Sequence, residues 1–194
     1  MPEPISNNSN LAEAYRRLTT DWITKRSGGK LQPFTPAGAA GFLGNTQVET
    51  GSWDLTDMDV VEDGNGSKGR GISQFTGPRR TAYDRAREQA VNAGIDPNNL
   101  DFQMGHIVDE YLGKHDGVAG GNSLSGYSKA FETCGQKKDP VKASICFNDE
   151  YFRPSEPHME RRMAGAKAIS DIAGREGFTL PTVITKDNPY ARKR

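Results

Sequence analysis

The sequence lacks any long hydrophobic run. Its longest apolar stretch, Ala37 to Gly44, is far shorter than the roughly 18–20 residues that a membrane span needs. The N-terminus has no basic segment followed by an apolar one, so the sequence predicts no signal peptide. We therefore expect synthesis in the cytoplasm and no membrane partner.

Cysteine is nearly absent, with only Cys134 and Cys146 in 194 residues. Two cysteines cannot form a disulfide framework or a four-ligand zinc site. We expect them to be small buried side chains in a reducing cytosol, with a single bridge as the alternative. The histidines His106, His115 and His158 lack the paired spacing of metal ligands and are expected at surface or capping positions. The sequence thus predicts neither a metal nor a cofactor.

The chain has no excess of either charge, with 25 basic and 25 acidic residues. Because nucleic-acid binding depends on neutralising phosphates, this balance argues against a nucleic-acid partner. The charges are unevenly distributed, however. Five acidic residues and no basic one lie between Asp54 and Asp63, while residues 158–194 hold eight basic and four acidic residues.

Helical spacing of apolar residues dominates the rest of the chain. Caps, prolines and glycines bound the expected helices, which cover residues 11–22, 35–49, 78–93, 100–111, 127–134, 139–145 and 157–173. The glycine-rich residues 50–77 predict a loop with a short β-hairpin. The sequence therefore predicts an α+β fold that is mostly α, with a small β element after its second helix.

Carboxylates carry the most plausible chemistry. Glu49 ends an otherwise apolar helix, where desolvation and the acidic residues that follow are expected to raise its pKa, as a general acid requires. Asp59, Glu62 and Asp63 follow in a loop that a hairpin would fold back toward the helix end. One shielded and one solvated carboxylate across a cleft is an arrangement that glycosidases use. The alternative is that these residues form an acidic loop beside a helix end with no catalytic role.

Three segments of the chain form a combined motif. They are residues 40–51 (AGFLGNTQVETG), residues 71–76 (GISQFT) with the basic pair Arg79-Arg80, and residues 151–157 (YFRPSEP) with Arg161-Arg162. Together they resemble the phage tail lysozyme family. A helix-end glutamate followed by a G-[ILF]-x-Q-[WF] segment is also shared with goose-type lysozymes and lytic transglycosylases. The resemblance covers roughly residues 35–173.

The resemblance implies a lysozyme-like fold, in which a helical domain carries a small β-hairpin or sheet after the catalytic helix. It places the catalytic domain at residues 31–176. An N-terminal extension and helix would occupy residues 1–30, and residues 177–194 would form a basic extended tail.

Residue by residue, Glu49 matches the catalytic acid of the family, and Asp63 falls where family members place an acidic residue before Gly-Asn. Ser73, Gln74 and Phe75 match the strand that lines the sugar cleft. Phe75 replaces the usual tryptophan, which keeps a stacking face but loses the indole N–H.

Two departures from the family pattern affect the site. Thr50 replaces the usual serine, which is a mild change. The long acidic insert between Glu49 and Gly71 leaves the second carboxylate open, as Asp63, Asp59 or none.

The activity implied by the resemblance is that of a bacteriophage glycosidase that cleaves the glycan strands of peptidoglycan, as a hydrolase or a lytic transglycosylase. The enzyme would be carried in the virion tail, with other tail proteins as partners, and would open the wall as the phage genome enters the cell. Two alternatives stay open. One is a non-catalytic tail or ejection protein with a lysozyme-like domain, and the other is a cytosolic endolysin for host lysis.

Overall fold

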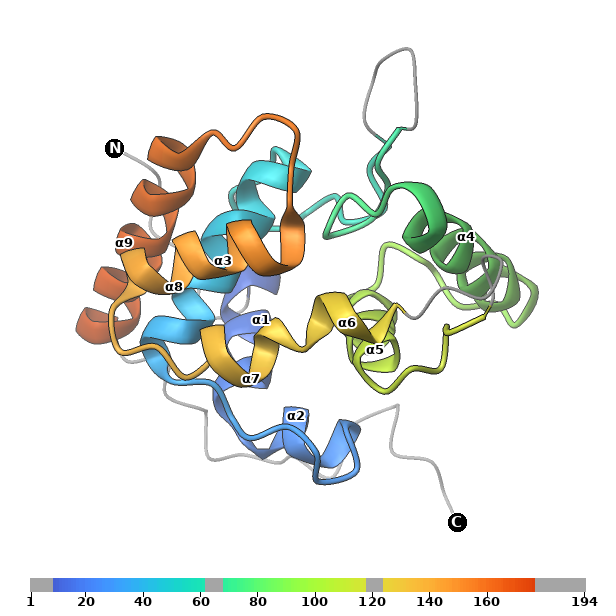
Figure 1. Cartoon of the computed structure of the whole chain (residues 1–194), viewed down its shortest axis with the longest axis horizontal. Coiled ribbons are helices and arrows are strands. Elements are labelled where there is room, and N and C mark those ends of the chain that lie inside the picture. The colour runs from blue at the N-terminus through green and yellow to red at the C-terminus, as the bar shows by residue number, and fades with distance from the viewer. Residues whose placement is uncertain (1–8, 62–67, 118–123, 177–194) are drawn as a thin grey trace.

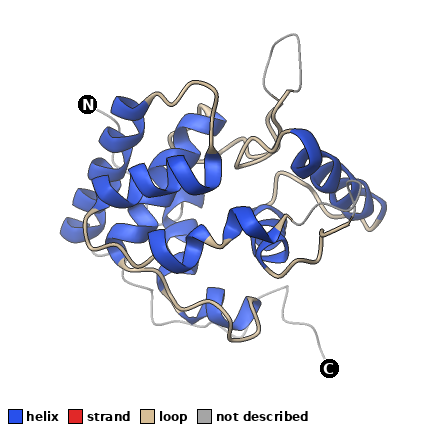
Figure 2. Ribbon diagram, viewed as in Figure 1, coloured by secondary structure: helices blue, strands red, loops and turns tan. Residues whose placement is uncertain are grey.

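The computed structural model describes residues 9–61, 68–117 and 124–176, and their secondary structure is helical (Figures 1 and 2). The helices are α1 (Asn10–Thr19), α2 (Asp21–Arg26), α3 (Pro36–Thr50), α4 (Gly77–Asn92), α5 (Leu100–Tyr111), α6 (Ser125–Ser128), α7 (Ala130–Cys134), α8 (Pro140–Phe147), the π-helical turn η1 (Asn148–Phe152) and α9 (Met159–Glu176). In this part of the chain, no helix is long and apolar enough to cross a membrane. The expected basic tail, residues 177–194, lies outside the described residues.

The predicted β-hairpin is wrong for the described part of residues 50–77. Only two isolated antiparallel bridges occur there, Val61 with Arg70 and Arg70 with Phe75. The second bridge closes a tight turn, because Gly71 (φ 79°) and Gln74 (φ 45°) both have left-handed backbone conformations that interrupt an extended strand. The described fold is therefore helical rather than α+β.

Helix α3 packs against α1, α8 and α9, in the group of helices on the left of Figure 1. As the sequence predicts, it starts at Thr35, whose hydroxyl accepts a hydrogen bond from the Gly38 N–H at 2.9 Å. It ends at Gly51, which adopts the left-handed conformation. Most of its side chains are buried, and Glu49 sits in its last turn.

Gly44 allows α3 and α9 to approach closely. A Cβ atom at this position would lie 2.5 Å from the Ala166 nitrogen and 2.8 Å from the Arg162 carbonyl oxygen. Only a residue without a side chain fits that space. The contact brings the first turn of α9 beside the last turn of α3.

The N-terminal helices belong to the same hydrophobic core. Leu11, Tyr15 and Leu18 of α1 and Ile23 of α2 are buried in it. The single helix expected over residues 11–22 is divided at Thr20, whose backbone is extended.

Two expectations about cysteine and histidine are wrong. Cys134 and Cys146 form a disulfide between α7 and α8 rather than two free thiols, because packing places their Cα atoms 5.5 Å apart, within bonding range. His106 is not on the surface but only 4% exposed, and its ring stacks on that of His115 at 4.4 Å between centroids. Phe75 and Tyr83 enclose the rest of the His106 ring edge to face.

Candidate active site

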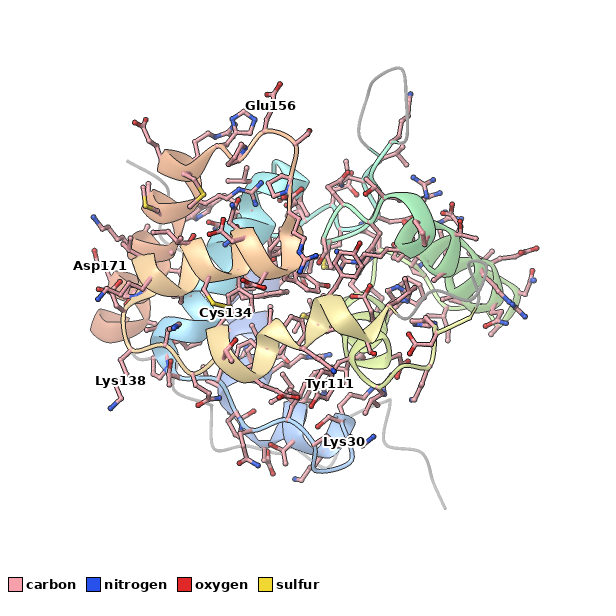
Figure 3. All side chains as sticks on the ribbon, viewed as in Figure 1. Lys30, Tyr111, Cys134, Lys138, Glu156 and Asp171 are labelled. Atoms are coloured by element: carbon pink, nitrogen blue, oxygen red, sulfur yellow. A yellow bond between two sulfur atoms is a disulfide. The ribbon has the colours of Figure 1, made fainter. Side chains whose placement is uncertain are left out.

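A groove of about 640 Å³ opens beside the end of α3, within the usual range of ligand sites. Four parts of the described chain line it: the end of α3, Val60 in the loop after α3, the turn that precedes α4, and the segment from η1 to the first turn of α9. Figure 3 labels Glu156 on the last of these segments. Residues far apart in the sequence therefore meet at this groove.

Glu49 lines the groove and is paired with a buried arginine. Its Oε1 lies 2.7 Å from Nη2 of Arg162, and the two side chains are 12% and 1% exposed. A guanidinium at this distance favours the charged form of a carboxyl group, which opposes the effect of burial. The raised pKa of Glu49 was expected from burial and acidic neighbours alone, without the charge of Arg162.

Arg162 is held by two further contacts. Its Nη1 donates a hydrogen bond to Oδ1 of Asn45 at 3.0 Å, and its Nε donates to the Pro157 carbonyl. Asn45 in turn donates to the carbonyl oxygens of Gly41 at 2.8 Å and Ser144 at 3.0 Å. The guanidinium thus has one fixed orientation toward Glu49. Arg162 was not among the site residues predicted from the sequence, although the Arg161-Arg162 pair in the third motif was a signal for it.

Gln74 lines the same groove from the turn before α4. Its Nε2 donates to the carbonyl oxygens of Val60 and Gly71, both at 3.2 Å. Its Oε1 receives no hydrogen bond from the described residues. The structure therefore brings Glu49 and Gln74 together, as the family motif implies.

Phe75 and Ser73 do not line the groove. Phe75 is fully buried and stacks on Tyr83 at 5.2 Å between ring centroids. Ser73 is 3% exposed and accepts a hydrogen bond from the Tyr151 hydroxyl at 3.4 Å. The phenylalanine in place of the family's tryptophan thus fills the core of the protein instead of offering a face to a ligand.

The second carboxylate has three candidates. Asp63, the first choice from sequence, lies outside the described residues. Asp59 does not line the groove, and Arg70, Arg87 and Tyr83 all donate hydrogen bonds to it, at 2.7–2.9 Å. Burial alone would raise the pKa of Asp59, but these hydrogen bonds outweigh it and hold the pKa below its usual value.

Glu156 is the third candidate, and it was not among the site residues predicted from the sequence. It lines the groove, its side chain is 81% exposed, and its Oε2 lies 3.5 Å from Nε2 of His158. The groove therefore contains one shielded carboxylate, Glu49, and one solvated carboxylate, Glu156.

Backbone strain is concentrated around the groove. Of the four non-glycine residues with positive φ in the described chain, Gln74, Arg153 and His158 line it, with φ between 45° and 47°. The π-helical turn η1 ends immediately before Arg153. Strained residues persist only where the surrounding packing holds them in place, and both they and π-helical turns are enriched at functional sites.

The groove offers carboxylate, amide, guanidinium and imidazole groups. No group of three or more histidine, cysteine, aspartate or glutamate side chains among the described residues could hold a metal ion. These groups suit acid–base catalysis on an uncharged substrate that carries hydroxyl groups. A carboxyl group can exchange a proton, and an amide can hydrogen-bond hydroxyls.

The comparisons with known proteins agree with this geometry. A search of curated proteins gave no match. A family model described as phage tail lysozyme matches residues 29–172, which include all three motifs and every described residue that lines the groove. The chain therefore belongs to the phage tail lysozyme family.

Proposed function

We propose that the protein is a bacteriophage glycosidase that cleaves peptidoglycan, with Glu49 as the general acid. The observation that carries the proposal is that Glu49 and Gln74 line one groove, walled by strained residues, in a member of the phage tail lysozyme family. Glu49 protonates the oxygen of the bond between N-acetylmuramic acid and N-acetylglucosamine, so that the leaving sugar departs as an alcohol. Gln74 hydrogen-bonds the sugar.

Arg162 positions Glu49 rather than reacting itself. It is buried behind the carboxyl group, so its ion pair fixes the direction in which the second oxygen points. A sugar bound in the groove removes water from Glu49, which favours the protonated form against the pull of Arg162. Proton uptake then accompanies substrate binding.

The second step separates two reaction types. A second carboxylate, either Asp63 or Glu156, stabilises the oxocarbenium-like state or orients a water molecule, which gives a reducing sugar end. Without such a carboxylate, the 6-hydroxyl of muramic acid attacks and gives an anhydro end. Mass spectrometry of the released fragments distinguishes the two ends, and Asp63→Asn and Glu156→Gln assign the carboxylate.

Tail association is the location that we propose. The disulfide between α7 and α8 supports work outside a reducing cytosol, because disulfides persist in oxidising surroundings. A virion-borne enzyme acts there, at the cell wall, as the phage genome enters the cell. Detection of the protein in purified particles tests this, whereas its presence only in lysates supports an endolysin.

The substitution Glu49→Gln tests the activity. The amide is nearly isosteric but cannot donate the proton, so we expect release of soluble fragments from purified peptidoglycan to fall by about 10²-fold or more. Glu88→Gln is the matched control, because Glu88 is exposed on α4, away from the groove. Thermal unfolding of both variants verifies that they fold. Full activity of folded Glu49→Gln would refute the assignment, and glycan binding without fragment release by the wild type would favour a non-catalytic tail protein.

A further inference from the structure

A second groove, of about 420 Å³, adjoins the groove that contains Glu49. Val48 and Arg161 line both grooves, so the two lie side by side at the junction of α3 and α9. Small residues, Gly51, Ala164 and Gly165, leave space in the second groove. Its volume falls within the usual range for ligand sites.

Arg161 gives the second groove its charge. Of the described residues that line this groove, only Arg161 is charged. It is exposed at the start of α9, and its guanidinium forms no ion pair with the described residues. Arg162, the next residue, is buried and paired with Glu49. A guanidinium with its donors unused at the junction of two grooves suits a carboxylate.

Trp53 and Gln47 supply the remaining recognition groups. Trp53 is half-buried and packs on the core at one side of the groove. Gln47 is 7% exposed and donates from Nε2 to the Trp53 carbonyl at 2.8 Å. The indole Nε1 and the Gln47 Oε1 are buried and have no hydrogen-bond partner among the described residues. These two unpartnered groups of lining residues are one donor and one acceptor, the same pair of groups that a peptide bond presents to its surroundings.

We propose that the second groove binds the anionic peptide attached to muramic acid, with Arg161 holding a peptide carboxylate and Trp53 covering the apolar part. This inference rests on the proposed function, because a muramic acid in the first groove brings its peptide beside the second. It makes the enzyme selective for peptidoglycan over a neutral glycan. A bare glycan leaves Arg161 without a ligand.

Trp53 fluorescence tests the inference without any bond cleavage. The chain has two tryptophans, so Trp22→Phe leaves Trp53 as the only emitter. Three probes are titrated: muramyl dipeptide, N-acetylmuramic acid with only its lactyl carboxylate, and N-acetylglucosamine with neither group. We expect a saturable change in emission with muramyl dipeptide, a Kd at least fivefold higher for N-acetylmuramic acid, and no saturation with N-acetylglucosamine in that range.

Substitutions on α9 then identify the cation. In the same background, Arg161→Gln is expected to raise the Kd for muramyl dipeptide at least fivefold. Lys167→Gln, at an exposed position of α9 that lines neither groove, is expected to keep it. An unchanged Kd in Arg161→Gln, equal Kd values for muramyl dipeptide and N-acetylmuramic acid, or no saturation with muramyl dipeptide would each overturn the inference. Because binding is measured directly, an inactive wild type that still binds muramyl dipeptide would refute the proposed function and leave this inference standing.

Discussion

The two sides of the Glu49 groove are stabilised by different kinds of contact. The α3 side (α3, α8 and α9) is held by close backbone packing at Gly44 and by a cluster of phenylalanine rings around Phe42. The α4 side (α4, α5 and residues 68–76; Figure 1) has a buried ion pair beside its stacked rings. Arg79 lies 2.6 Å from Glu110, with the two side chains 7% and 1% exposed. Backbone packing thus dominates the side that carries Glu49, whose ion pair with Arg162 lies at the groove, whereas an ion pair lies within the core of the side that carries Gln74.

This difference in contacts matters for function because each side holds a different wall of the same groove. Contacts between small residues and rings carry no titratable group, so the contacts at Gly44 and Phe42 do not depend on charge. A buried ion pair leaves an uncompensated charge when one of its groups is neutralised. We therefore expect substitutions that remove the charge of Arg79 or Glu110 to act first on the Gln74 wall.

Loss of the buried ion pair is the largest effect that we expect on stability. Glu110→Gln leaves the Arg79 guanidinium buried without a counter-charge, which costs about 3–5 kcal/mol of the free energy of unfolding. Urea unfolding followed by circular dichroism measures it. Glu88→Gln, the same substitution at an exposed position of α4, is expected to change stability by less than about 0.5 kcal/mol. A loss below about 1 kcal/mol in Glu110→Gln would show that the α4 side does not depend on this charge pair.

Close packing on the α3 side predicts an intermediate effect. A methyl group at Gly44 would overlap the α9 backbone, so Gly44→Ala is expected to cost about 2–3 kcal/mol although alanine favours helices. Gly174→Ala is the matched control, because a Cβ at Gly174 of α9 meets no atom within 4 Å. It is expected to stabilise the protein by about 0.5–1 kcal/mol. The same sign for both substitutions would contradict the role given to the α3–α9 contact.

Local signals in the sequence predicted the α3 side well. The cap at Thr35 predicted the start of α3, because capping depends on neighbouring residues only. The expected end at Glu49 lies one residue before the observed end at Thr50. The family motif also placed Gln74 at the groove. The ion pair between Glu49 and Arg162 was missed, since it joins residues more than 100 positions apart and exists only once α9 packs on Gly44.

The α4 side was predicted less well for physical reasons. Residues 71–75 were expected to form a strand of the hairpin, and nothing local shows that Gln74 adopts a left-handed conformation that interrupts it. A phenylalanine in such a segment can face a cleft or a core. The burial of Phe75 depends on its contacts with Tyr83 of α4 and His106 of α5. These choices depend on tertiary packing, which outweighs local preference.

The smallest expected effect tests the acid sensitivity of the α4 side. Burial, reinforced by the charges of His115 and Arg79, lowers the pKa of His106 to about 3, well below the 6.5 of an unfolded histidine. Below pH 6.5 the unfolded chain therefore binds a proton that the folded chain does not, so stability is complete above pH 6.5 and falls as the pH decreases toward 3. The loss is about 1.4 kcal/mol per pH unit. Asp59, whose pKa is also lowered, loses its contribution only at more acidic pH, below its ordinary value of 3.8.

His106→Leu keeps a side chain of similar size at this position and removes the titration. Urea unfolding at pH 7.5 and pH 5.5 is expected to show that the wild type loses about 1.4 kcal/mol more than the variant over this interval. Because His106 stays neutral in the folded protein at pH 5.5, the ring packing around Phe75 is expected to be unchanged over this interval. Equal losses in the two proteins would mean that His106 takes up its proton in the folded state. Burial of its neutral ring would then add no acid sensitivity to the α4 side.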